Sequence, residues 1–330
     1  MKKLIKRITC LVLVAALVAS LAGCAKLNYV TNGTIQAIQE VKSGEWKNAG
    51  EEGADDAAAQ EDTSVLEKSF EPNTYGGVEF KDFNDVANYY VEAYNYTKTL
   101  TAQYKDADGK TQTFYKMLGS ENLEVGSVMI DGKENSTINS LVPSIVGPMF
   151  DANIYGLVPS GNRNPELDNN LDDPTRKNDH DYRTSTFTGD DILDANIVDN
   201  GDGTITMTIQ PKQEELAFRG EGSQGSFFEV LGDITAAVKS ITVLSFTEGD
   251  ASDNVKVMYK GGTGVITIDT KTKEITAAKY VMIANVDVTH ASIAIIKDKS
   301  ASVKITYTNE YPASDEYLKE RRGVRSEERR

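Results

Sequence analysis

Apolar and polar residues alternate along much of the second half of the chain, a pattern typical of β-strands with one buried face. The clearest stretch is Glu274–Thr289, and its inward-facing set is Tyr280, Met282, Ala284, Val286 and Val288. This stretch is much longer than an ordinary strand, so we expect it to bend or to carry a β-bulge. Shorter strands are predicted at 191–198, 204–210, 255–259, 264–268 and 302–308. Turn sequences such as Asp199–Gly203 join neighbouring strands as antiparallel hairpins.

Helical spacing of apolar residues occurs in three segments. Asp82 or Asn84 can cap a first helix that runs to about Tyr96, and Tyr90 and Tyr94 lie near its apolar face. The residues from 136 to 150 also have near-helical spacing, limited by two prolines. The residues Ser226–Glu229 have the form of a capping box, which predicts a third helix ending near residue 239. A hairpin is predicted between the first two helices, at 97–104 and 111–117.

These elements predict an α+β fold with a twisted, mostly antiparallel β-sheet and two or three helices packed on one face. The sheet is expected to be a meander, which can also curve into a half-barrel. The arrangement is similar to the half-barrels of bacterial lipoprotein carriers, whose concave face holds acyl chains. The resemblance is architectural and no motif residue carries it. It implies a ligand site between sheet and helices, for which the candidate residues are Met282, Ala284, Val286, Tyr90 and Tyr94.

The N-terminus has the layout of a secretory signal. Four basic residues precede the apolar run Leu11–Leu21, which is too short to span a bilayer comfortably. The residues Leu21-Ala22-Gly23-Cys24 follow, and they resemble the lipobox of bacterial lipoproteins at all four positions. This resemblance covers the first 24 residues. It implies cleavage before Cys24 and a diacylglycerol on its sulfur, whereas the alternative is an ordinary signal peptide that contains a cysteine.

Composition divides the chain into four parts. Residues 1–23 form the signal peptide, and residues 24–64 form a lipidated N-terminus with a possible strand and an acidic linker. The linker, from about residue 48, has too few large apolar side chains to fold by itself. Residues 65–312 form the main α+β domain, and residues 313–330 form a charged C-terminal tail.

Charge and cysteine content exclude several classes of function. The formal net charge is −15, and removal of the four signal cations leaves −15 − 4 = −19, so nucleic acid is not an expected partner. The two cysteines, Cys10 and Cys24, are assigned to the signal and the anchor, which excludes thiol catalysis, zinc–thiolate sites and iron–sulfur clusters in the mature domain. The expected location is the bacterial cell envelope, lipid-anchored to a membrane and facing outside the cytoplasm. The oligomeric state stays open.

Few residues of the sequence suggest a nucleotide, cation or catalytic site. Gly220–Gly225 matches a dinucleotide-binding pattern, but it lacks the parallel βαβ context that such a site needs. Asp168, Asp172 and Asp173 lie in an acidic loop that is a weak candidate for a cation site, because their spacing fits no EF-hand. The two histidines, His180 and His290, are not expected to be catalytic. We expect no cofactor and no catalytic residue.

Three functions remain open. The first is a membrane-anchored protein that binds an apolar or amphipathic small molecule between sheet and helices. The second is an envelope scaffold or adhesion module without a small ligand. The third is an extracytoplasmic hydrolase that uses carboxylates. A large apolar interior cavity would favour the first function, a packed core the second, and convergent buried carboxylates the third.

Overall fold

The computed structural model describes residues 62–105, 109–116, 119–134, 139, 185–218, 220–231, 234, 238–239, 244–293 and 296–313. Within these residues the dominant element is an open sheet of eleven strands, and all the strand pairs found there are antiparallel. The expected mostly antiparallel α+β fold is therefore confirmed at this level. The strands follow the alternating segments of the sequence, because period-two patterning can bury one face of a sheet and leave the other wet.

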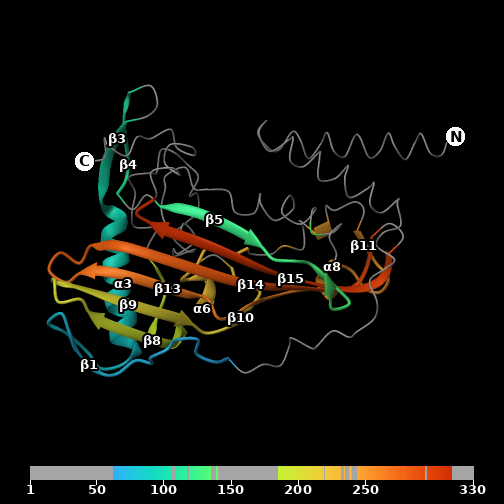
Figure 1. The fold of residues 1–330 in the computed structure, drawn as a ribbon, viewed down its shortest axis with the longest axis horizontal. Helices are drawn as coiled ribbons and strands as arrows, with labels where there is room; N and C mark the ends of the chain where they lie inside the picture. Colours follow the sequence, from blue (N-terminus) through green and yellow to red (C-terminus); the bar gives the residue numbers. More distant parts are fainter. Residues whose placement is uncertain are drawn as a thin grey trace.

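Two long strands form the centre of the sheet. β14 (Ile275–Ile293) and β15 (Ile296–Tyr311) pair along most of their length, as Figure 1 shows. Their register shifts twice between Val288 and Ile293, so the bulge expected for so long a strand is confirmed. His290 and Asp298 lie in this irregular end, and both have a φ of 51°, in the left-handed region.

Shorter strands lie in series along each side of this pair. On one side β14 pairs successively with β13 (Thr263–Asp269), β12 (Val255–Tyr259) and β11 (Leu244–Phe246). On the other side β15 pairs with β5 (Ser120–Val125) and β6 (Met129–Ile130). The sheet is completed by β7 (Lys133–Glu134), β8 (Ile192–Asp199), β9 (Thr204–Pro211) and β10 (Glu214–Glu215).

The helix α3 (Phe83–Thr99) runs across the strands rather than along them (Figure 1). Asp82 caps it by accepting hydrogen bonds from the backbone N–H groups of Asn84 and Asp85, as the sequence predicts. At its other end, the hydroxyl of Thr97 accepts a 2.8 Å hydrogen bond from the backbone N–H of Ile275 in β14. This bond ties the last turn of the helix to the first residue of the longest strand.

The helix is followed by the predicted hairpin, β3 (Thr101–Lys105) and β4 (Thr111–Tyr115), which forms a separate two-stranded sheet. A second small hairpin, β1 (Asn73–Tyr75) and β2 (Val78–Phe80), precedes α3. The remaining described elements are short: the 3-10 helix η6 (Gly189–Asp191) and the four-residue helices α6 (Gly222–Gly225) and α8 (Ala251–Asn254).

The N-terminal segment 62–76 lies against the edge strand β8 and is held by side chains. The buried carboxylate of Asp194 accepts hydrogen bonds from the hydroxyls of Ser64 (2.5 Å) and Ser69 (2.8 Å). Gln210, also buried, accepts from the backbone N–H of Val65 and donates to a carbonyl of the same segment. We call residues 62–76 the strap. The strap therefore joins side chains of the two paired strands β8 and β9.

The helix predicted from Ser226 to about residue 239 is wrong in its first part: Val238 and Lys239 are helical, and the backbone N–H of Val238 bonds to the carbonyl of Ile234, but residues 226–231 are not helical. The short α6 ends at Gly225, Ser226 is its C-cap, and the next five residues are not helical. The physical reason is burial: every residue from 224 to 230 is buried, including two consecutive phenylalanines. A helix at the surface of a sheet cannot bury all of its sides, so tertiary packing overrides the local capping signal.

Candidate functional site

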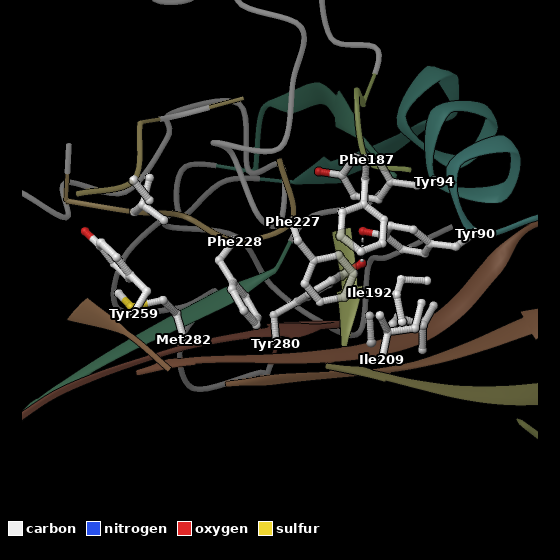
Figure 2. Close-up of a cluster of buried hydrophobic side chains, with 14 of the residues drawn as sticks. Tyr90, Tyr94, Phe187, Ile192, Ile209, Phe227, Phe228, Tyr259, Tyr280 and Met282 are labelled. Carbon is white, nitrogen blue, oxygen red and sulfur yellow. Dashed lines mark hydrogen bonds between the residues drawn. The ribbon is translucent and has the colours of Figure 1, made fainter. Parts of the chain in front are cut away.

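The candidate ligand residues all belong to one buried cluster on one side of the sheet, in which Met282 lies beside Tyr259 and away from Tyr90 and Tyr94 of α3 (Figure 2). Met282, Ala284 and Val286 are at most 7% exposed, and Tyr90 and Tyr94 are fully buried. Intervening residues such as Asn285 and Asp287 are partly exposed, so the predicted two faces of β14 are confirmed. The structure therefore brings the five candidate residues to the same side of the sheet.

Aromatic side chains fill the space between them. Figure 2 shows Phe187, Phe227 and Tyr280 gathered beside Tyr90. Ring centroids lie 5.2 Å apart for Tyr90 and Phe227, 5.4 Å for Phe227 and Tyr280, and 4.8 Å for Phe187 and Phe227. These are contact distances for aromatic pairs, so the rings touch and leave no room for an acyl chain between them.

Two glycines, one in β13 and one just before it, show how closely the buried rings approach the backbone. A Cβ built at Gly264 of β13 would lie 2.6 Å from the Phe227 ring. A Cβ at Gly262 would lie 2.6 Å from the carbonyl oxygen of Val281 and 3.1 Å from the Phe228 ring. Both rings therefore rest directly on the backbone of the sheet. Only glycine permits this approach, and it gives the interior the density of a packed core.

One polar contact crosses this core. The hydroxyls of Tyr90 on α3 and Tyr280 on β14 lie 3.1 Å apart and form a buried hydrogen bond. Burial raises the pKa of Tyr280 far above its ordinary value, so this phenol stays protonated at any physiological pH. The pair satisfies two buried hydroxyls and positions the helix on the strand. It offers neither a general base nor a nucleophile.

The opposite face of the sheet carries a small polar hollow of about 140 Å³. Its lining residues come from β5, β14 and β15, and they are Ser120, Asn122, Glu124, Lys279, Thr308 and Glu310. Lys279 and Glu310 form an ion pair of 2.6 Å within it. The hollow is too polar and too small for an apolar ligand, since ligand pockets usually enclose about 300–1,000 Å³.

His290, in the irregular end of β14, forms a close contact with Asp298, a partner that could not be identified from the sequence pattern. Its Nδ1 lies 2.9 Å from a carboxylate oxygen of Asp298, which also accepts a 2.9 Å hydrogen bond from the hydroxyl of Thr247. The hydrogen bond to Asp298 raises the pKa of His290. The hydroxyl donates to the carboxylate and not to the imidazole, so the histidine is not placed to activate it as a nucleophile.

A partly buried acid lies beside the glycine-rich loop. Glu214 of β10 accepts a 2.8 Å hydrogen bond from the backbone N–H of Gln224 in α6. Burial raises the pKa of Glu214, although hydrogen bonds from Gln224 and Gly225 oppose the shift. The glycine-rich sequence thus wraps a protein carboxylate where a nucleotide-binding loop would hold a phosphate.

The other candidate residues lie outside the described residues: Cys24, the loop aspartates Asp168, Asp172 and Asp173, and His180. In the part of the chain that the structure describes, no three His, Cys, Asp or Glu side chains gather in a way that could hold a metal ion. In the same part, no helix has the length and apolar character required to cross a membrane.

Comparison with known proteins gives no relative from which a role could be transferred. The chain matches no protein-family model, no curated protein and no solved structure.

Proposed function

We propose that this chain is a membrane-anchored extracytoplasmic lipoprotein that works as an envelope scaffold or adhesion module through its outer surface. The observation that carries the proposal is the packed interior. The five residues expected to line a ligand site are buried, and aromatic rings lie on Gly264 of β13 and on Gly262 just before it. A carrier of acyl chains needs an apolar cavity at this place, and a scaffold needs a rigid core.

The anchor is part of the same proposal and rests on the Leu21–Cys24 signature. Two acyl chains on Cys24 would hold an acidic domain at a bilayer that its own charge does not favour. We also propose that the sheet curves into an open half-barrel and that two or three helices cover one face, of which α3 is one.

The anchor is tested with Cys24→Ala in cells. We expect the parent to partition into the detergent phase and the variant to lose this behaviour and keep its signal segment. Equal partitioning of the two proteins with membranes would contradict lipidation.

The scaffold is tested against the carrier by native mass spectrometry of protein purified from its own host. We expect one mass that matches the polypeptide and its anchor lipid. An additional apolar molecule, bound in a fixed ratio and released on unfolding, would favour the first function instead.

A further inference from the structure

We infer that His290 is a pH-dependent latch, which fastens the segment after β11 to the irregular end of β14 and β15 when its imidazole is protonated and loosens it when the imidazole is neutral. The inference depends neither on the lipid anchor nor on the scaffold function. It rests on a cluster of side chains at the end of the sheet that lies far from α3 (Figure 1).

The imidazole of His290 lies between two carboxylates, with one ring nitrogen near each. Its Nδ1 is 2.9 Å from an oxygen of Asp298 in β15, and its Nε2 is 3.8 Å from an oxygen of Glu248, two residues after the end of β11. The hydroxyl of Thr247 donates to the same oxygen of Asp298, and the backbone N–H of Thr247 donates a 2.9 Å hydrogen bond to the carbonyl of His290. Side chains of three segments therefore meet at one imidazole.

The backbone is distorted where these side chains meet. His290 and Asp298 lie within the two register shifts of the β14–β15 pair. Each has a φ of 51°, which few residues other than glycine adopt without strain. Strain of this kind persists only where surrounding contacts hold it, and it is frequent in switch regions. Here it coincides with the contact between the imidazole and the carboxylate.

The two protonation states of His290 differ in the contact with Glu248. An ionised carboxylate only accepts hydrogen bonds, so the Nδ1 beside Asp298 carries a hydrogen in both states. In the neutral ring Nε2 then has a lone pair, which faces the negative charge of Glu248. Protonation replaces the lone pair with an N–H group and a positive charge, so the same contact becomes attractive.

The charges around the ring favour the protonated form. The pKa of His290 is raised above its ordinary value of 6.5 by the hydrogen bond to Asp298 first, and then by the charges of Glu248 and Asp298. The same hydrogen bond lowers the pKa of Asp298, which therefore stays ionised at neutral pH. The neighbouring cation, Lys299 of β15, forms an ion pair with Asp131. The latch is thus fully closed below pH 6.5, and it opens as the pH rises through the raised pKa of His290.

The backbone after β11 is positioned for this contact by a separate residue. The buried side chain of Asn254 donates hydrogen bonds to the carbonyls of Glu248 (2.6 Å) and Asp250 (2.9 Å), and it accepts a 2.9 Å bond from the hydroxyl of Thr289. None of these groups titrates near neutral pH. An open latch should therefore weaken the three-residue pairing of β11 with β14 and leave the rest of the sheet in place.

The test is amide hydrogen exchange of the full chain at about pH 6 and about pH 8.5, on either side of the histidine titration. Mass spectrometry follows the peptide that covers β11 and Thr247, and each rate is divided by the intrinsic exchange rate at that pH. His290→Asn removes the titration and keeps a residue that tolerates the left-handed backbone. Glu248→Gln removes one carboxylate. The matched control is His180→Gln, at the other histidine of the sequence.

We expect this peptide to be several-fold more protected at pH 6 than at pH 8.5 in the parent and in His180→Gln. We expect a smaller difference in Glu248→Gln and none in His290→Asn, with an unchanged far-UV circular dichroism spectrum. Titration of the ring protons by NMR should place the pKa of His290 above 6.5. Equal protection of the parent at both pH values, the same pH difference in His290→Asn, or a ring pKa at or below 6.5 would each show that His290 is not a latch.

Discussion

Ala284 is a residue at which substitutions can distinguish a packed core from a ligand cavity. It is fully buried on β14, whereas the carboxylate of Asp287 is on the partly exposed face opposite Lys256 of β12. We expect Ala284→Asp to lower the free energy of unfolding by several kcal/mol, because it buries an unpaired charge. Asp287→Ala is the matched change on the other face, and we expect it to cost about 0.5 kcal/mol or less. Urea denaturation checks both values, and an Ala284→Asp variant as stable as the parent would mean that the faces are assigned wrongly.

Glu214 is the residue at which pH should act on stability. Its pKa is raised by burial in the folded protein, so the folded state holds this proton more tightly than the unfolded state. The free energy of unfolding contributed by Glu214 is therefore highest below its ordinary pKa of 4.5, and it falls as the pH rises through the raised folded pKa.

We expect Glu214→Gln to remove this fall while keeping an acceptor for the Gln224 N–H. Urea denaturation of parent and variant between pH 4 and pH 7 measures the free energy of unfolding as a function of pH. Glu215→Gln, at the exposed neighbouring position, is the control. A parent and a Glu214→Gln variant with the same pH dependence would show that this carboxyl does not titrate differently on folding.

At the scale of elements, Asp194 accepts more hydrogen bonds from the strap than any other side chain described beside it. Asp194 accepts hydrogen bonds from Ser64 and Ser69 and from the backbone N–H of Phe70 (3.4 Å). We expect Asp194→Ala to release the strap from β8, so that trypsin cuts after the exposed Lys68 at a concentration that leaves the parent intact there. Asn196→Ala, on the same strand, is the control. Equal resistance of Lys68 in all three proteins would show that the strap is held by something other than Asp194.

Elements were predictable where local pattern and tertiary packing agree. Alternation placed β8, β9, β12, β13 and β14, and the Asp82 cap placed the start of α3. The start of the helix predicted at Ser226 was wrong because Phe227 and Phe228 are both buried in the core, and a capping box carries no information about burial. The strap was not predictable, since its hydrogen bonds join residues more than 120 positions apart in sequence.

For the whole molecule, the sequence predicted the faces of the sheet correctly and left open whether the interior is filled. Periodicity shows which residues point inward, but the space between layers depends on side chains from distant segments. Here Phe187 and Phe227, from two separate segments, occupy that space beside Tyr90. The inward-facing residues of a carrier and of a packed scaffold therefore look alike in sequence.

The most direct test of the packed interior is the melting temperature of Ala284→Trp. Insertion of a large side chain into a filled core typically costs about 1–3 kcal/mol or more. For a domain of this size each kcal/mol corresponds to roughly 2–4 °C. Ile283→Trp, at the partly exposed neighbouring position, controls for the presence of an indole in this strand. We expect Ala284→Trp to melt clearly below both the parent and the Ile283→Trp control. A variant that melts with the parent would show that space for an indole, and therefore for a ligand, exists beside the inner face of β14.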